Sequence, residues 1–388
     1  MTITKDILYV GVNDHDIDLF EGQFDVPLGM AYNSYVINDE KIAVIDSVET
    51  RFSAEWLSGI EAATGGRAPD YLIVQHMEPD HSSSITDFMD KYPETVIAAS
   101  NQAFVMMKNF YGKDYAERRM VVTEGAKLSL GRHELTFITA PMVHWPEVIM
   151  TYDAADKVLF SADGFGKFGA NDVEDPEGWA CEARRYYFGI VGKFGMQVQN
   201  VLKKAAGLEI EHICSLHGPV LPLPGEDISY YINTYDTWSA YRAESEGVFI
   251  AYTTVYGHTR QAAELLAEKL KAAGCPRVAI ADLAREDFYE SVEDAFRHDR
   301  LVLATTTYNG EIFPKMDDFI RALLERGYQN RRIGIIENGS WAPAAARIIK
   351  KLFENSKDIT WAENTVTIKS ALSEASEAQI DALAGEFA

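Results

Sequence analysis

Residues 71–84 read YLIVQHMEPDHSSS, and this stretch sets the first expectations about the fold. Its apolar beginning is typical of a buried strand, and its serines can cap a following helix. Between them, His76, Glu78, Asp80 and His81 place four possible metal ligands within six positions. Because burying these side chains without a metal would leave charges unpaired, the stretch predicts a metal site. Imidazole and carboxylate ligands together suit iron, manganese or zinc.

Three later residues extend this candidate site, and each follows an apolar, strand-like run. They are His144 in VHWPE, Asp163 in LFSADGFG and His217 in SLHGP. Loops at strand ends can gather on one edge of a sheet, so we expect these side chains to converge with the first four. Each residue alone has an ordinary interpretation, as a packed histidine or as an Asp-Gly turn. The histidines that lack such neighbours are assigned to structure: His15, His133, His212 and His298.

The composition is that of a globular chain with an acidic surface. Of 388 residues, 47% are hydrophobic and 24% are charged, which excludes a disordered or collagen-like chain. Lys and Arg total 36 and Asp and Glu total 59, so the net charge of −23 disfavours binding to nucleic acid and to anionic membranes. No stretch approaches the ~20 apolar residues of a membrane span, and the first residues lack the pattern of a secretory signal.

The three cysteines, Cys181, Cys214 and Cys275, are far apart in the sequence. They form no CxxC pair, which excludes a rubredoxin-type iron site and a zinc ribbon. So few cysteines, in an odd number, fit a reducing compartment. We therefore expect a cytoplasmic protein.

The length favours two domains, and the clearest boundary lies in the polar stretch Tyr241–Gly247. We predict one domain over residues 1–246 and another over residues 247–388. The second domain has five apolar runs that alternate with helical patterns. In chain order they are VFIAYTT, CPRVAIADL, RLVLATTT, RRIGIIEN and TVTIK. Ser373 is placed to cap the last helix. This pattern predicts an α/β domain with a doubly wound parallel sheet of flavodoxin size.

The first domain has a different pattern. Short alternating strands such as SYVIND, KIAVID, TVIAAS, KLSL and HELTFITA suggest hairpins and antiparallel sheet. Helical patterns cover Ala54–Thr64, Ser84–Lys91 and Arg184–Ala206. Together they predict an α+β domain or a layered αββα arrangement.

Three loops of the second domain follow strands and carry hydroxyls, glycines and aromatic rings. The first precedes a helix, where backbone N–H groups and the helix dipole favour phosphate. There is no Walker lysine and no GxGxxG, which disfavours ATP and dinucleotides. Because a doubly wound sheet binds its ligand beyond the carboxyl ends of its strands, the loops predict a phosphate-bearing ligand beside Tyr308 and Trp341. The residues are Thr254, Val255, Tyr256, Gly257, His258, Thr259, Thr306, Thr307, Tyr308, Asn309, Gly310, Asn338, Gly339, Ser340 and Trp341.

The metal stretch resembles the HxHxDH signature of the metallo-β-lactamase fold, with Glu78 in place of the second histidine. That replacement, followed by the three later ligands, is similar to the flavodiiron proteins, and NSYVINDEKIAVIDSVE resembles the first hairpins of that fold. The resemblance implies that His76, Glu78 and His144 hold the iron nearer the flavin. It implies that Asp80, His81 and His217 hold the other iron, with Asp163 as the bridge.

The second domain resembles flavodoxin, and TYNGEIFP is similar to the second flavin loop of flavodiiron proteins. The resemblance implies FMN as the cofactor. The third loop, NGSWAPAAA, is less rich in glycine than the family's version. The chain thus resembles the minimal two-domain form of the family, a metallo-β-lactamase-like αββα domain followed by a flavodoxin-like domain.

The resemblance further implies an oxidoreductase that reduces O2 to water with four electrons, or two NO to N2O with two. Electrons would come from a separate donor, a rubredoxin or, in some relatives, a reduced deazaflavin. The family arrangement is a head-to-tail homodimer, with dimers of dimers as a further possibility. Four aromatic residues are candidates for the surroundings of the irons and are equally compatible with core packing: Tyr187 first, with Phe24, Tyr32 and Trp145.

Two other interpretations remain open at this stage. The chain could be a zinc-dependent hydrolase of the metallo-β-lactamase fold with a flavodoxin appendage. It could also be an electron carrier or redox sensor without catalysis, which would show flavin chemistry but consume neither O2 nor NO. Metal analysis separates the first from a di-iron reductase, and gas consumption separates the second.

Overall fold

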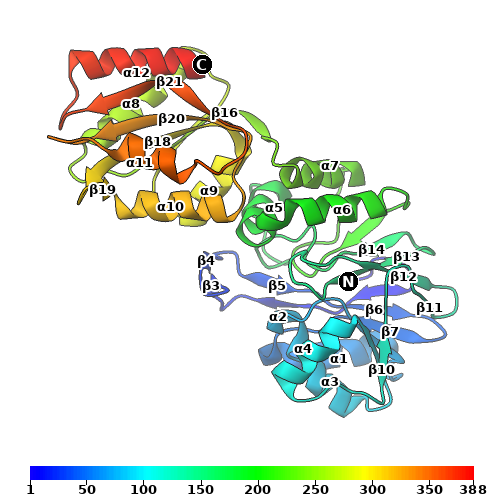
Figure 1. Cartoon of the computed structure of the whole chain (residues 1–388). Coiled ribbons are helices and arrows are strands. Elements are labelled where there is room, and N and C mark those ends of the chain that lie inside the picture. The colour runs from blue at the N-terminus through cyan, green and yellow to red at the C-terminus, as the bar shows by residue number, and fades with distance from the viewer. The chain divides into compact units, whose positions relative to one another are not determined.

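The computed structural model describes all residues, 1–388, and the chain forms two compact units (Figure 1). Unit 1 comprises Met1–Tyr187 and Met196–Asp236, and unit 2 comprises Phe188–Gly195 and Thr237–Ala388. The chain therefore passes between the units three times. No helix combines the length and the apolar character needed to cross a bilayer.

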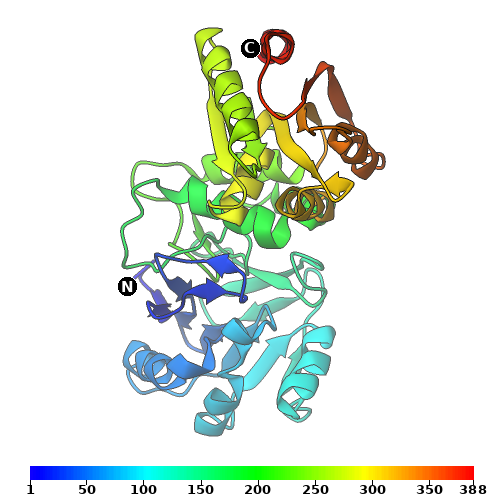
Figure 2. The same ribbon diagram turned by 90° about the vertical axis from the view of Figure 1, so that its left-hand side faces the viewer.

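Unit 1 contains two sheets packed face to face with helices outside them, which confirms the predicted αββα layers. One sheet has the order β1-β6-β7-β8-β9-β10 and the other β11-β12-β13-β14-β15. Figures 1 and 2 show α1, α3 and α4, in blue to cyan, together on one side of this unit. A core of fully buried side chains, among them Ile37, Ile73, Phe137 and Phe160, fills the space between the sheets. Burial of this apolar surface is the main stabilising contribution.

The strands of unit 1 are β1 (Ile7–Tyr9), β2 (Val12–Asp14), β3 (Leu19–Phe20), β4 (Phe24–Asp25), β5 (Met30–Tyr32), β6 (Tyr35–Asn38), β7 (Ile42–Ile45), β8 (Tyr71–Val74), β9 (Val96–Ala99), β10 (Arg119–Val121), β11 (Lys127–Ser129), β12 (Glu134–Thr139), β13 (Ile149–Asp153), β14 (Val158–Phe160) and β15 (His212–Cys214). Its helices are α1 (Ser53–Thr64), α2 (Pro79–Ser82), α3 (Ile85–Lys91), α4 (Asn101–Tyr111), α5 (Trp179–Tyr186) and α6 (Gly195–Ala205), and α7 (Ile228–Ser239) leads into unit 2.

The pairing within the first sheet corrects one sequence expectation. The strands β1, β6 and β7 pair antiparallel as predicted, but β7, β8, β9 and β10 pair parallel. Helices α1, α3 and α4 lie between these strands in the chain, and such crossovers return the chain in the same direction. The short strand patterns alone did not reveal which connections were hairpins and which were crossovers.

Unit 2 has the predicted doubly wound sheet. Its strands run in the order β17-β16-β18-β20-β21 and are all parallel, the order of flavodoxin-like sheets. The elements are β16 (Ser245–Tyr252), α8 (His258–Ala272), β17 (Val278–Asp282), α9 (Phe288–Arg297), β18 (His298–Tyr308), β19 (Glu311–Ile312), α10 (Pro314–Glu325), β20 (Arg331–Asn338), α11 (Ala345–Leu352), β21 (Ile359–Ile368) and α12 (Glu374–Phe387).

Helices cover both faces of this parallel sheet, with α8 and α12 on one face and α9, α10 and α11 on the other (Figure 1). Buried aliphatic side chains such as Ile250, Leu266, Val302 and Leu383 form the core beneath α8 and α12. The Ser373 side chain accepts a hydrogen bond from the backbone N–H of Ser376, which confirms the predicted cap of α12. This fold brings the carboxyl ends of the strands to one edge.

The helix predicted over Arg184–Ala206 is wrong as one continuous element. The structure starts α5 at Trp179, then forms a π-turn over Tyr187–Val191 and a 3₁₀ turn over Gly192–Phe194 before α6. Glycines at 189, 192 and 195 leave this stretch without side chains on one side, and glycine weakens a helix interior. The interrupted segment belongs to unit 2, where the Phe188 ring stacks on Phe296 with centroids 4.1 Å apart.

Gly195 allows the close approach on which this segment depends. A Cβ atom at Gly195 would lie 2.4 Å from the Ser239 carbonyl oxygen and 2.7 Å from the Tyr241 ring. We expect Gly195→Ala to lower the free energy of unfolding by about 1–3 kcal/mol, the usual range for overpacking. Gly385→Ala is the matched control, because nothing lies within 4 Å of its added Cβ. Thermal unfolding of the two variants gives the comparison, and equal midpoints would contradict the expectation.

Candidate functional site

The seven predicted metal residues come together at one edge of the sheets of unit 1. His76 follows β8, and Glu78 stands before α2, which carries Asp80 and His81 in its single turn. His144 lies between β12 and β13, Asp163 follows β14, and His217 follows β15. This arrangement agrees with the prediction from the sequence that loops at the strand ends would bring these side chains together.

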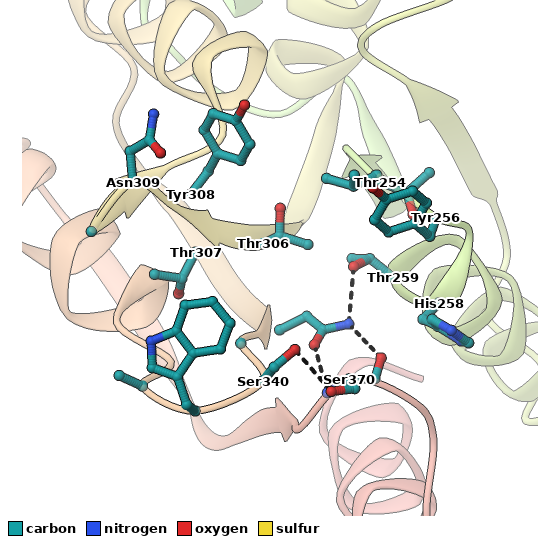
Figure 3. A pocket seen from close by; sticks show the side chains of 16 residues that line it. Thr254, Tyr256, His258, Thr259, Thr306, Thr307, Tyr308, Asn309, Ser340 and Ser370 are labelled. Atoms are coloured by element: carbon teal, nitrogen blue, oxygen red, sulfur yellow. Dashed lines mark hydrogen bonds between the residues drawn. The ribbon is translucent and has the colours of Figure 1, made fainter.

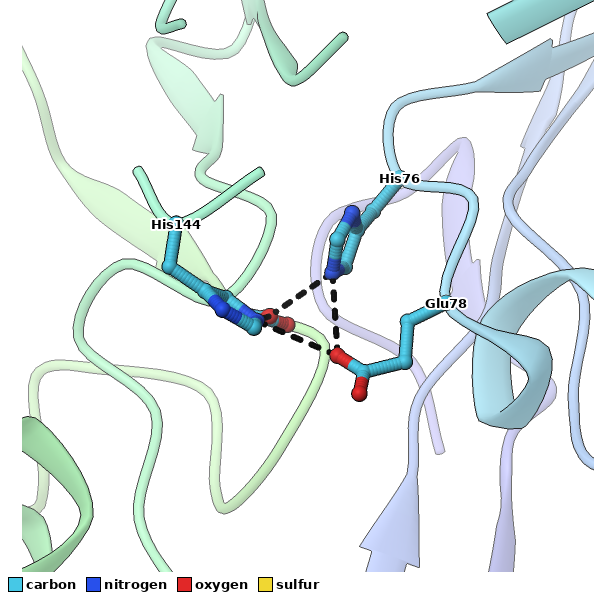
Figure 4. Close-up of side chains that lie close together, drawn as sticks. His76, Glu78 and His144 are labelled. Carbon is cyan, nitrogen blue, oxygen red and sulfur yellow. Dashed lines mark hydrogen bonds and ion pairs between the residues drawn. The ribbon is translucent and has the colours of Figure 1, made fainter. Parts of the chain in front are cut away.

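The side chains form two adjacent groups. His76, Glu78, His144 and Asp163 make the first group (Figure 4), and Asp80, His81 and His217 make the second. In the first, the Glu78 Oε2 atom lies 3.2 Å from His76 Nε2 and 3.1 Å from His144 Nε2. In the second, the His81 and His217 Nε2 atoms face each other at 2.9 Å, and Asp80 Oδ2 lies 3.1 Å from His81 Nε2. Each group thus aims its polar atoms at one point.

Asp163 connects the two groups. Its Oδ2 atom lies 3.2 Å from His76 Nε2 and 3.1 Å from His144 Nε2. Its Oδ1 atom lies 3.5 Å from His81 Nε2 and 3.8 Å from His217 Nε2. Neither oxygen makes a hydrogen bond of good geometry, although the side chain is only 1% exposed. Carboxylate oxygens and imidazole nitrogens that converge at these distances without a hydrogen bond of good geometry are arranged for cations between them, so the residues present fit a two-metal site.

The charges of the site attract one another strongly. Although burial opposes the carboxylate, His76 and His144 hold the pKa of Asp163 well below its usual range. Although burial opposes the imidazolium, Asp163 and Glu78 raise the pKa of His144 to about 9. The pKa of His76 is raised in the same way by Asp163 and Glu147. Metal loading must therefore displace protons from these imidazoles.

Polar groups behind the ligands fix the orientation of two rings, and sequence reasoning missed them. The Glu147 carboxylate lies 2.8 Å from His76 Nδ1 and accepts the Met77 backbone N–H at 2.9 Å. His217 Nδ1 donates to the Ala31 carbonyl oxygen at 2.8 Å. Both contacts leave Nε2 directed at the centre of the site. Glu147 stands three residues after His144 in VHWPE, so its position beside a candidate ligand was the available signal.

We expect Glu147→Ala to weaken metal binding about 10- to 100-fold, as losses of such supporting carboxylates generally do. Glu147→Gln keeps an oxygen that can accept from both His76 and Met77, so its metal affinity should stay close to that of the parent chain. Competition with a chelator of known affinity measures both variants, and their melting curves serve as the control for folding. Equal affinities of the alanine and glutamine variants would show that Glu147 does not orient His76.

Aromatic side chains surround the second group. The rings of Phe20 and Tyr186 each lie 5.4 Å from the His217 ring, centroid to centroid, and Tyr32 lies 6.2 Å away. Trp145 packs edge-on against His76 at 5.3 Å. Of the aromatic candidates, Tyr187 packs on Tyr235 and Phe24 packs on Phe168. Tyr186, the neighbour of Tyr187, contacts the ring of the candidate ligand His217 and was not among the candidates.

A third group of possible ligands, His133, Asp153 and Asp156, lies elsewhere in unit 1. His133 Nδ1 lies 2.9 Å from the Asp153 carboxylate, and the Arg132 guanidinium lies 3.0 Å from His133 Nε2. A cation placed there would meet this positive charge, and every nitrogen of the ring already has a partner. We therefore keep His133 among the structural histidines.

The three predicted loops of unit 2 line one pocket at the carboxyl ends of the strands, with a volume of about 730 Å³ (Figure 3). All of the predicted residues line it except Gly257, which is the N-cap residue of α8 and has a positive φ of 93°. Sequence reasoning missed Ala342 and Ser370, which complete the lining. Ser370 follows the last strand, where the sequence shows neither a phosphate-binding loop pattern nor an aromatic residue.

The pocket wall is held by hydrogen bonds between the loops. Asn338 Nδ2 donates to the Ser370 carbonyl oxygen at 3.0 Å, and Ser370 Oγ donates to Ser340 Oγ at 2.8 Å. Thr254 Oγ1 accepts the Gly257 backbone N–H at 3.0 Å, at the start of α8. The buried Thr306 hydroxyl has no partner. An unpaired hydroxyl, a helix N-terminus and a pocket of this size fit a phosphate-bearing flavin.

Aromatic rings stand at the mouth of this pocket. Tyr256 and Trp341 are 91% and 92% exposed, and Tyr308 is 44% exposed. Several large aromatic side chains exposed around one pocket are typical of a ligand or partner site. Their position fits the planar ring of a flavin.

Comparison with known proteins agrees with the two domain types. The profile named ODP family beta lactamase matches residues 30–218, and a flavodoxin domain profile matches residues 249–367. A putative diflavin flavoprotein of Synechocystis sp. is 31% identical over 332 residues, covering 84% of this chain. The chain spans 56% of the length of that relative.

This chain covers a larger share of two further relatives. The anaerobic nitric oxide reductase flavorubredoxin of Escherichia coli is 28% identical over 356 residues, 89% of this chain and 73% of that protein. The solved flavodiiron protein of Giardia intestinalis superposes with a TM-score of 0.90 and 26% identity, covering 99% of this chain and 95% of that one. The two histidine–carboxylate groups and the flavodoxin pocket fit a di-iron centre and FMN as cofactors. With both profiles matched in this order and the solved flavodiiron protein superposing over 99% of the chain, the chain belongs to the flavodiiron protein family.

Proposed function

We propose that this chain is a flavodiiron reductase that passes electrons from an external donor to O2, NO or both. The observation that carries the proposal is Asp163, whose two oxygens face the two groups of ligands separately. His76, Glu78 and His144 would hold one iron, Asp80, His81 and His217 the other, and Asp163 would bridge them. When bound, FMN would supply two-electron redox chemistry, and the iron pair would supply the redox chemistry toward the gas.

The chain's own residues support a small uncharged substrate. Phe20, Tyr186 and Tyr32 surround His217, and the ligand side chains are buried or nearly so. Around the second group, such aromatic surroundings favour a small, weakly polar substrate over a large charged one. Together with the flavodoxin unit, they favour a reductase over the zinc hydrolase.

The flavin would be held by the loops of the pocket in unit 2. The start of α8, with Thr254 and Thr259, would bind the phosphate, and Tyr308 and Trp341 would contact the ring. We also propose that two chains pair head to tail, so that the flavin of one serves the irons of the other. A cytoplasmic location is in keeping with three cysteines that form no disulfide.

One preparation tests the proposal. The chain is loaded anaerobically with iron and FMN, and metal and flavin are measured for each chain. With excess reduced donor, the consumption of O2 and of NO is then compared on the same sample. We expect two irons and one FMN per chain and turnover of at least one gas. Two zinc ions, or iron with flavin reduction but no gas consumption, would contradict the proposal.

A further inference from the structure

The surface beside the flavin pocket carries a concentration of positive charge in a strongly acidic chain. Helix α11 follows the third pocket loop directly and exposes Arg347, Lys350 and Lys351. From Asn338 to Phe353 there is no Asp or Glu, although 59 of 388 residues are acidic. We call the three side chains Arg347, Lys350 and Lys351 the basic face of α11.

The basic face is not used to stabilise the chain itself. Arg347 and Lys351 make no ion pair, and Lys350 lies over the Trp361 ring at 5.6 Å. The neighbouring α10 shows the usual arrangement, since Arg321 pairs there with Asp317 at 2.6 Å. Arg347 and Lys351 are four residues apart and therefore lie on one side of the helix. Three adjacent cations without internal carboxylate partners are available to an outside one.

The start of α11 is joined to the pocket loops. The Ala344 backbone N–H donates to Thr307 Oγ1 at 2.9 Å, and the Ala346 N–H donates to Glu337 Oε2 at 2.9 Å. Trp341, 92% exposed, stands at the pocket mouth a few residues before the helix. A partner held by the basic face would therefore lie beside the flavin pocket.

We propose that the basic face of α11 docks a small acidic electron-carrier protein. The inference rests on the proposed function, because a reductase supplied from outside needs a carrier close to its flavin. With a net charge of −23, most of the chain repels an acidic protein, so a local basic surface both attracts the carrier and orients it. Charge complementarity thus selects the partner and its position together.

The test measures docking without electron transfer. A zinc-substituted rubredoxin of net negative charge is titrated into the FMN-loaded chain by calorimetry at low and at high salt. We expect the variant R347E/K350E/K351E to bind about tenfold or more weakly than the parent at low salt, and high salt to weaken the parent. The control K108E/K203E/K271E changes the net charge equally at exposed lysines in other helices and should bind like the parent.

Equal binding by the two triple variants would overturn the docking inference. A second result would also overturn it: the α11 variant changes its molar mass in light scattering but binds the carrier as tightly as the parent does. In that case the basic face would contact a second copy of this chain. The proposed function is judged separately, by gas consumption of the parent with a small-molecule reductant. If that turnover is absent, the reductase proposal fails, whatever the affinity for the carrier.

Discussion

Asp163→Ala is expected to empty both halves of the metal centre and to lower turnover by more than about 100-fold. Loss of a group that merely supports a ligand already costs about 10- to 100-fold, and Asp163 faces four histidine nitrogens directly. Without its carboxylate, nothing else in the site reaches both groups. The two metals would also lose the group that holds their separation, about 3.5–4 Å in two-metal sites.

Asp80→Ala is the matched comparison, because it removes a carboxylate of equal size from one group only. The Asp80 carboxylate pairs with His81 and His217 and belongs to the second group only. We expect this variant to keep the metal of the first group, and therefore to contain close to one metal ion per chain. Metal analysis and gas consumption measure both variants, with FMN content as the control for folding. Equal metal loss and equal rates in the two variants would count against a bridging role for Asp163.

Mixing two inactive chains is expected to restore about a quarter of wild-type activity. One chain carries His76→Ala and keeps its flavin loops, and the other carries Thr254→Ala and Thr259→Ala and keeps its ligands. In the proposed head-to-tail dimer, each hybrid has one intact pairing of flavin and irons. Random reassociation makes half of the dimers hybrid, and each has half of its sites intact.

The experiment requires that the dimers dissociate and reform. Wild-type dimers taken through the same dissociation and reassembly show that the procedure preserves activity, and each variant alone gives the background. If the mixture stays at background while the wild type recovers, electrons pass within each chain and the composite site is refuted. The outcome does not depend on whether O2 or NO is the gas.

The sequence was most informative where chemistry and strand ends coincide. His76, Glu78, Asp80 and His81 lie within six consecutive positions after a strand, so their convergence could be predicted from that spacing and from the need for a metal to compensate their burial. The flavin loops were found for a similar reason, because parallel strands end at one edge. At these places, local pattern and overall fold agree.

Other features depend on contacts between distant residues and could not be read locally. The helical pattern over Arg184–Ala206 hides a break that exists because Phe188 packs on Phe296 and Gly195 packs against Ser239. Ser370 reaches the pocket through hydrogen bonds with Asn338 and Ser340 that no sequence motif marks. The sequence shows Glu147 close to His144, but its role in orienting the His76 ring follows only from the contact between the two side chains in the folded chain.

The placement of Phe188–Gly195 in unit 2 has a consequence for how the chain is made. During synthesis this segment leaves the ribosome long before its partners, since Phe296 and Arg326, which donates to the Gly189 carbonyl oxygen, lie far downstream. In the nascent chain, the face of the Phe188 ring that stacks on Phe296 therefore stays uncovered until residue 296 has been synthesised, although Trp238 can contact the ring earlier. Domains generally fold in the order in which they leave the ribosome. Here the segment Phe188–Gly195, which interrupts the first unit, can reach its final position only after the second unit has been synthesised. Expressing residues 247–388 alone would leave the Phe296 ring without its stacking partner.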